Sequence, residues 1–95
     1  MIVGILEVKL VMRQAQSLKD KRRIIRSLKD RLRARFNCSV AEVESQDFWQ
    51  TGELAVVEVS NDSRYVQGAL EQALGVIGQC RDAQIASHRI ELLHH

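Results

Sequence analysis

The chain has 95 residues, which is enough for one domain with a single core. Hydrophobic residues make up 45% and charged residues 27%, a composition typical of a folded soluble protein. Two cysteines are too few for a disulfide scaffold, and the early apolar run is interrupted by Glu7 and Lys9. Because that run is too short for a signal peptide or a membrane span, we expect a cytoplasmic protein.

The net charge of +2 conceals a strong asymmetry along the chain. Residues 17–36 contain nine basic and two acidic side chains and therefore carry +7, whereas the remainder carries −5. Such a separation of charge bears on partners and association rather than on fold.

The first half of the chain reads as a strand followed by a helix. Apolar residues alternate over 2–12, which predicts a long strand with both faces partly covered. Ser17 is a suitable N-cap, with Asp20 placed to hold the first helical turn. Apolar residues then recur at helical spacing as far as residue 36, and Asn37 is predicted to end the helix in a left-handed conformation.

The second half reads as a hairpin, a helix and a last strand. Two alternating segments, 38–44 and 53–60, flank the polar connection 45–52, which predicts an antiparallel hairpin. The cap-forming residues 61–63 precede an amphipathic helix, followed by a strand over about 84–93. Gly68, Gly75 and Gly78 weaken that helix, so we expect close approach to a neighbouring backbone as compensation.

The resulting β-α-β-β-α-β order predicts an α+β, ferredoxin-like fold over residues 1–95. It has a four-stranded antiparallel sheet with two helices on one face. No further element remains to cover the opposite face. Val3, Ile5 and Val11 share one face of the first strand, and if that face is the uncovered one, it predicts a homodimer formed through the open sheet.

Four blocks of sequence, in order, resemble the YlxP-like family of short bacterial proteins of unknown function. They are Met1-Ile2-Val3-Gly4, Ser17-Leu18-Lys19-Asp20-Lys21-Arg22-Arg23, Phe36-Asn37-Cys38-Ser39-Val40-Ala41-Glu42-Val43 and Val59-Ser60-Asn61-Asp62. One departure is that the segment before Ser17 often contains proline in the family and has none here. The resemblance implies a ferredoxin-like fold. Because the family's genes often lie among those for translation initiation and ribosome maturation, it also implies association with RNA or the ribosome.

The first helix carries the strongest candidate site. Five basic residues lie side by side on a helical wheel, next to the apolar arc, and we call them the basic stripe: Lys19, Arg22, Arg26, Lys29 and Arg33. A row of this kind can follow a phosphate backbone, which predicts a nucleic-acid contact. The alternative is a solvated helix face that only keeps the protein in solution.

Three further residues have both a structural and a functional interpretation. Lys21 lies on the apolar arc, so we expect its stem to pack against the sheet and its amine to reach an acid such as Glu42 or Glu44. Phe48 and Trp49, the aromatic pair, could contact a partner or stack on a base. The alternative for Trp49 is that it covers the end of the core.

The sequence predicts no catalytic residues, no metal site and no cofactor. There is no glycine-rich phosphate loop, and the fragment at 66–68 that is similar to part of an acylphosphatase signature lies in the second predicted helix rather than in the first strand-helix loop. Cys38 and Cys80 are not spaced as metal ligands and read as small buried hydrophobic residues, and His88 reads as a core or edge residue. His94 and His95 resemble the remnant of a purification tag.

The leading hypothesis is a non-enzymatic module that binds RNA or the ribosome through the basic stripe. The alternative is a homo-oligomeric interaction or regulatory module that pairs through the open sheet face. A small phosphohydrolase is a third, weaker candidate.

Overall fold

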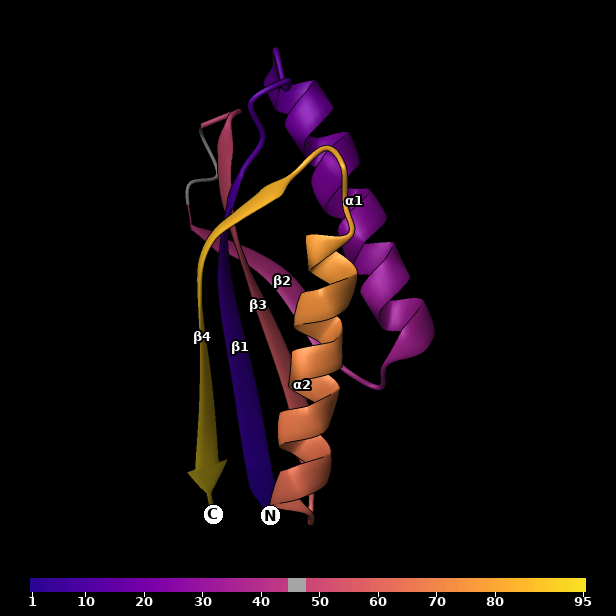
Figure 1. Cartoon of the computed structure of the whole chain (residues 1–95), viewed down its shortest axis with the longest axis vertical. Helices are drawn as coiled ribbons and strands as arrows, with labels where there is room; N and C mark the ends of the chain where they lie inside the picture. Colours follow the sequence, from indigo (N-terminus) through magenta and orange to yellow (C-terminus); the bar gives the residue numbers. More distant parts are fainter. Residues whose placement is uncertain (45–47) are drawn as a thin grey trace.

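The computed structural model describes residues 1–44 and 48–95. Its elements follow in the order β1 (Ile2–Val11), α1 (Leu18–Arg35), β2 (Ser39–Glu44), β3 (Thr51–Ser60), α2 (Ser63–Gly78) and β4 (Gln84–His94). The four strands form one antiparallel sheet in the order β2-β3-β1-β4. Both helices lie on the same side of this sheet (Figure 1). The predicted α+β, ferredoxin-like fold is confirmed.

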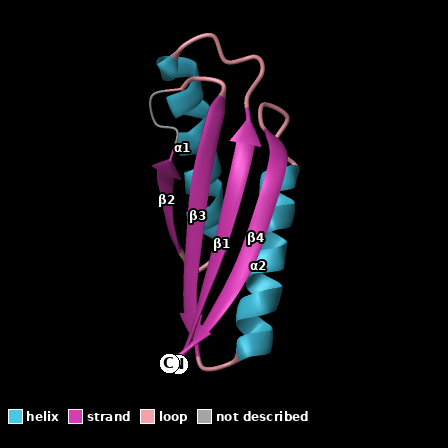
Figure 2. Ribbon diagram, turned by 90° about the vertical axis from the view of Figure 1, so that its left-hand side faces the viewer, coloured by secondary structure: helices cyan, strands magenta, loops and turns pink. Residues whose placement is uncertain are grey.

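The alternation along β1 divides the sheet into a covered and an open face. Even-numbered residues of β1 point toward the helices, and Leu6, Val8 and Leu10 are buried there. They pack with the apolar faces of both helices and with β3 into one continuous core. The other face of the sheet bears no helix (Figure 2). The expectation of an uncovered sheet face therefore holds for the residues that the structure describes.

The strand register is irregular at both edges of the sheet. The register between β1 and β4 shifts between Lys9 and Leu10, and β4 curves away from a straight course in the same region (Figure 1). The register between β2 and β3 shifts between Glu42 and Glu44. β2 is also the shortest strand, with six residues.

Some predicted boundaries differ from the structure. Helix α1 ends at Arg35 with Phe36 in an extended conformation, so Asn37 does not end it as predicted. Phe36 is partly buried against the core. Strand β3 begins at Thr51 rather than residue 53, because Thr51 and Gly52 pair with the end of β1. Residues 45–47 of the predicted connection lie outside the described residues.

The glycines of α2 do not have the role predicted for them. A Cβ atom added at Gly68 or Gly75 would meet no heavy atom within 4 Å, and one at Gly78 would lie 3.7 Å from Ile85 Cδ1. No close approach to a neighbouring backbone compensates for these residues. Gly4 of β1 is different, because a Cβ atom there would overlap Val66 and lie 2.8 Å from Leu70 Cδ1. The close packing of α2 on the sheet therefore depends on the glycine in β1.

Replacing Gly68 or Gly75 with alanine should stabilise the protein. Each substitution removes the conformational entropy of a helical glycine without a steric conflict, and should raise the free energy of unfolding by up to about 1 kcal/mol. Urea unfolding followed by circular dichroism measures the change. Gly4→Ala is the contrasting variant and should unfold at lower urea concentration. Equal destabilisation by all three substitutions would contradict this interpretation.

Glu58 should make stability depend on pH. It is buried on the helix-facing side of β3, and burial raises the pKa of its carboxyl. Between the unfolded and folded pKa values the folded state holds more protons, so its stability falls as pH rises through that window. Glu58→Gln should therefore raise Tm at neutral pH, and the gain should disappear below about pH 4, where glutamate is protonated in both states. A gain that persists in acid would contradict the assignment.

Candidate nucleic-acid interface

The start of α1 is held by its own side chains. Ser17 is the N-cap, and its Oγ accepts a hydrogen bond from the backbone N–H of Asp20 at 3.1 Å. The Asp20 carboxylate accepts one in return from the backbone N–H of Gln16 at 3.0 Å. These reciprocal bonds satisfy N–H groups at the helix terminus. The predicted cap is confirmed, and it fixes the turn on which the basic stripe begins.

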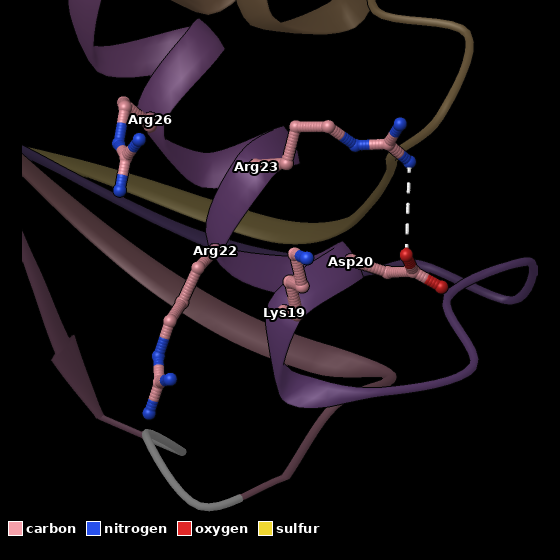
Figure 3. Close-up of a pocket in the computed structure, with 5 residues that line it drawn as sticks. All are labelled: Lys19, Asp20, Arg22, Arg23 and Arg26. Atoms are coloured by element: carbon pink, nitrogen blue, oxygen red, sulfur yellow. Dashed lines mark ion pairs between the residues drawn. The ribbon is translucent and has the colours of Figure 1, made fainter.

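The N-terminal part of the basic stripe is exposed. Lys19, Arg22 and Arg26 line a shallow hollow together with Asp20 and Arg23. Arg22 and Arg26 extend to one side of the helix, whereas Arg23 reaches the other side (Figure 3). Arg23 is 3.9 Å from Asp20 there, the outermost range of an ion pair. Arg22 and Arg26 therefore stand apart from the acid of the same turn.

The C-terminal part of the stripe is more closely engaged with the fold. Lys29 is half-buried. Arg33 donates a hydrogen bond from Nη2 to the carbonyl oxygen of Val40 in β2 at 3.1 Å. All five residues of the stripe lie on one helix as predicted. Its N-terminal part is both exposed and less engaged with the rest of the fold than its C-terminal part.

Lys21 is the most buried charged residue in the described chain, with 1% of its surface exposed. Its Nζ lies 2.9 Å from Glu42 Oε2 in β2 and donates a hydrogen bond of 2.6 Å to the carbonyl oxygen of Phe48. The predicted pairing with an acid of this segment, Glu42 or Glu44, is confirmed, and the acid is Glu42. The stem passes over Gly52, where an added Cβ atom would lie 3.5 Å from Lys21 Cε. Neither the Phe48 carbonyl nor Gly52 was evident from the sequence as part of this arrangement.

The aromatic pair lies outside the core. Phe48 is 66% exposed and Trp49 is 49% exposed, and both line a hollow with Gln50 and Thr51. Trp49 is not among the residues of the core cluster, and about half of its surface is exposed. The backbone beneath the pair is anchored on both sides, by Lys21 at Phe48 and by residue 50, whose carbonyl accepts from the Met12 N–H at 2.8 Å.

Other titratable groups do not form a second site in the part of the chain that the structure describes. Cys38 is half-buried, and burial raises the pKa of its thiol, with a smaller contribution from Glu58. A raised pKa keeps the thiol protonated and disfavours nucleophilic chemistry.

No cluster of three metal-ligating side chains occurs among the described residues. His88, expected in the core or at an edge, is exposed on edge strand β4. No described helix is long and apolar enough to cross a membrane.

The open sheet face has an apolar end. Val3 of β1 is paired with Val59 of β3 on one side and with Leu93 of β4 on the other. Val59 is 56% exposed and Leu93 is 43% exposed. Ile5 and Val57 form the adjacent cross-strand pair. Next to this apolar end the face carries charges of both signs, because Glu91 is paired with Ile5 and forms an ion pair of 2.8 Å with Arg89.

Solved structures share the fold at low sequence identity. A structural-genomics protein called YJCS aligns with a TM-score of 0.61 at 8% identity, covering 97% of this chain and 99% of that one. The de novo designed protein Foldit4 aligns with a TM-score of 0.58 at 12% identity, covering 100% and 99%. Rv0793 from Mycobacterium tuberculosis aligns with a TM-score of 0.56 at 17% identity, covering 100% and 95%. At these identities the likeness shows the fold alone.

The sequence comparisons are more specific. The uncharacterized protein YlxP of Bacillus subtilis (strain 168) is 29% identical over 76 residues, which cover 80% of this chain and 83% of YlxP. A family model described as "Protein of unknown function (DUF503)" matches residues 3–90. The chain therefore belongs to the DUF503 family, and the YlxP-like resemblance recognised in its sequence is confirmed.

Proposed function

We propose that this protein is a binding module that contacts RNA, free or within the ribosome, through the N-terminal part of its basic stripe. The supporting observation is that Lys19, Arg22 and Arg26 are exposed together. Among residues 1–44 and 48–95, none of the three has an acidic partner within 4.0 Å. Charged groups arranged in this way remain available for phosphates.

The energetics of α1 support the same proposal. Arg22 and Arg26 are four residues apart on the helix, and like charges at that spacing repel each other by a few tenths of a kcal/mol. Among the described residues Asp20 pairs with Arg23 rather than with either of them. The stripe therefore costs the isolated helix a little stability. A bound polyanion would offset that cost by neutralising the charges and releasing counterions.

Removing the exposed charges should weaken RNA binding without harming the fold. The variant Lys19→Gln/Arg22→Gln/Arg26→Gln keeps similar helix propensity and should leave Tm unchanged or slightly higher. Its affinity for a short RNA should fall. The slope of log K against log salt should flatten by about 0.7 for each lost phosphate contact with a single strand. Fluorescence anisotropy with a labelled RNA over a salt series measures both quantities.

The matched control removes the same net charge elsewhere. Arg31, Arg64 and Arg81 are exposed and lie outside the stripe, so their triple replacement by glutamine should retain most of the affinity and most of the salt slope. Equal losses in the two variants would show that net charge alone governs binding. That result, or a stripe variant that binds as the parent does, would contradict the proposed interface.

A second candidate function is self-association through the open sheet face. The observation that favours it is the apolar row Val59–Val3–Leu93 across three neighbouring strands, in which Val59 and Leu93 are exposed and Val3 is partly buried. Contiguous apolar surface of this kind marks interaction sites. A second copy of the chain suits the surface, because a two-fold axis through the apolar end places like patches against each other. The Arg89–Glu91 ion pair beside this row favours such a partner over a polyanion.

The dimer prediction is tested by sedimentation velocity. The parent protein should dimerise at micromolar concentration, and Val59→Lys/Leu93→Lys should be monomeric, because two charges would have to be buried in the interface. Thr51→Lys/Ser87→Lys adds the same charges at the other end of the open face and should remain dimeric. A parent protein that stays monomeric throughout would rule out this function.

A further inference from the structure

We infer that the RNA bound by this protein is single-stranded, with an unpaired base stacked on the aromatic pair. The inference rests on the proposed function and specifies its ligand class. The observation that supports it is that the buried ammonium group of Lys21 links α1, the helix of the basic stripe, to the backbone of the aromatic pair. Lys21 lies between Lys19 and Arg22 in α1, and its Nζ is bonded to the backbone at Phe48.

The backbone around the aromatic pair is fixed at several points. The Phe48 carbonyl accepts the 2.6 Å bond from Lys21. The Gln50 carbonyl accepts a hydrogen bond from the N–H of Met12, just after β1, and Gln50 Nε2 donates to the carbonyl oxygens of Arg13 and Ala15 at 3.3 and 3.4 Å. The two aromatic side chains nevertheless remain outside the core. A fixed backbone with exposed rings loses little conformational entropy when a ligand binds.

The chain has few aromatic residues, so the exposure of two adjacent ones is a distinctive feature of its surface. The chain has four aromatic residues, of which Phe48, Trp49 and Tyr65 are exposed, and only Phe48 and Trp49 are adjacent. Single exposed apolar residues are ordinary, but a neighbouring pair of rings lining one hollow is a contact surface. Sites for single-stranded nucleic acid combine exposed rings with cations that follow the backbone. Lys19 and Arg22 supply such cations on the helix that Lys21 anchors to Phe48.

Duplex RNA would make less use of this surface. Its bases are stacked inside the helix, and proteins recognise it mainly by shape and by phosphate and ribose contacts. The basic stripe alone could make such contacts. An exposed ring pair gains from the complex only when a base is unstacked and free to lie on it. The combination of cations and rings therefore favours a single strand.

The experiment compares an unstructured RNA oligonucleotide with the same sequence annealed to its complement. The parent protein should bind the single strand more tightly, by roughly ten- to hundred-fold for one stacked base. Trp49 is the only tryptophan, so its fluorescence reports on this site directly. Quenching is expected with the single strand and not with the duplex.

Variants assign the preference to particular residues. Phe48→Leu/Trp49→Leu keeps apolar side chains but removes the rings, and should lower single-strand affinity to the duplex level while duplex affinity stays the same. Lys21→Met/Glu42→Leu replaces the buried ion pair by apolar side chains, which proteins often tolerate without loss of stability. It removes the bond to Phe48, so a variant with the parent Tm should lose single-strand preference and retain duplex binding.

The outcomes separate the inference from the proposed function. Equal affinity for the two RNAs, with unchanged Trp49 fluorescence, would overturn the inference and leave the RNA-binding proposal in place. Failure to bind either RNA would overturn both. A Lys21→Met/Glu42→Leu variant that folds and keeps full single-strand preference would overturn the positioning role of Lys21. If that variant does not fold, the Phe48→Leu/Trp49→Leu variant still decides whether the rings bind RNA.

Discussion

The assembly of this molecule depends on how a buried ammonium is satisfied. An unpaired charge in an apolar core costs several kcal/mol, so Lys21 is tolerated only when its partners are in place. Those partners come from different segments, Glu42 in β2 and the carbonyl of Phe48 after it. The helix, the edge strand and the following connection must therefore come together in one arrangement. The bonds of Lys21 therefore position the backbone at Phe48, and with it the aromatic pair, relative to α1.

Much of the fold could be predicted because it is encoded in local patterns. Alternating and helical apolar spacing identified all six elements, and cap-forming residues located both helix starts. A pairing of Lys21 with Glu42 or Glu44 could be predicted because a lysine on an apolar arc needs an acid on the facing sheet, and the structure selects Glu42. The exposed stripe also follows from the helical wheel, since residues beside the apolar arc face solvent.

The remaining features depend on contacts between distant segments, which leave no periodic signal. The bond from Lys21 to a backbone carbonyl involves no recognisable side chain at the acceptor. Arg33 was assigned to the stripe by its angle on the wheel, but its hydrogen bond depends on where β2 passes. The α2 glycines suggested close packing, whereas the close contact is at Gly4, where a glycine in a strand is easily read as a neutral residue. The sequence shows where these glycines lie along the chain but not which side chains pack against them.

The irregular edges of the sheet affect how copies of the chain could assemble. An exposed strand edge presents unpaired N–H and C=O groups that invite another strand, and bulges or short strands impede this pairing. Here β2 is short and its register with β3 shifts, while β4 curves where its register with β1 shifts. β2 is too short to offer a long template, and β4 departs from a regular course near its start. Growth of the sheet into an intermolecular ribbon is thereby disfavoured, and a protein with a bare sheet face gains protection against fibrillar aggregation.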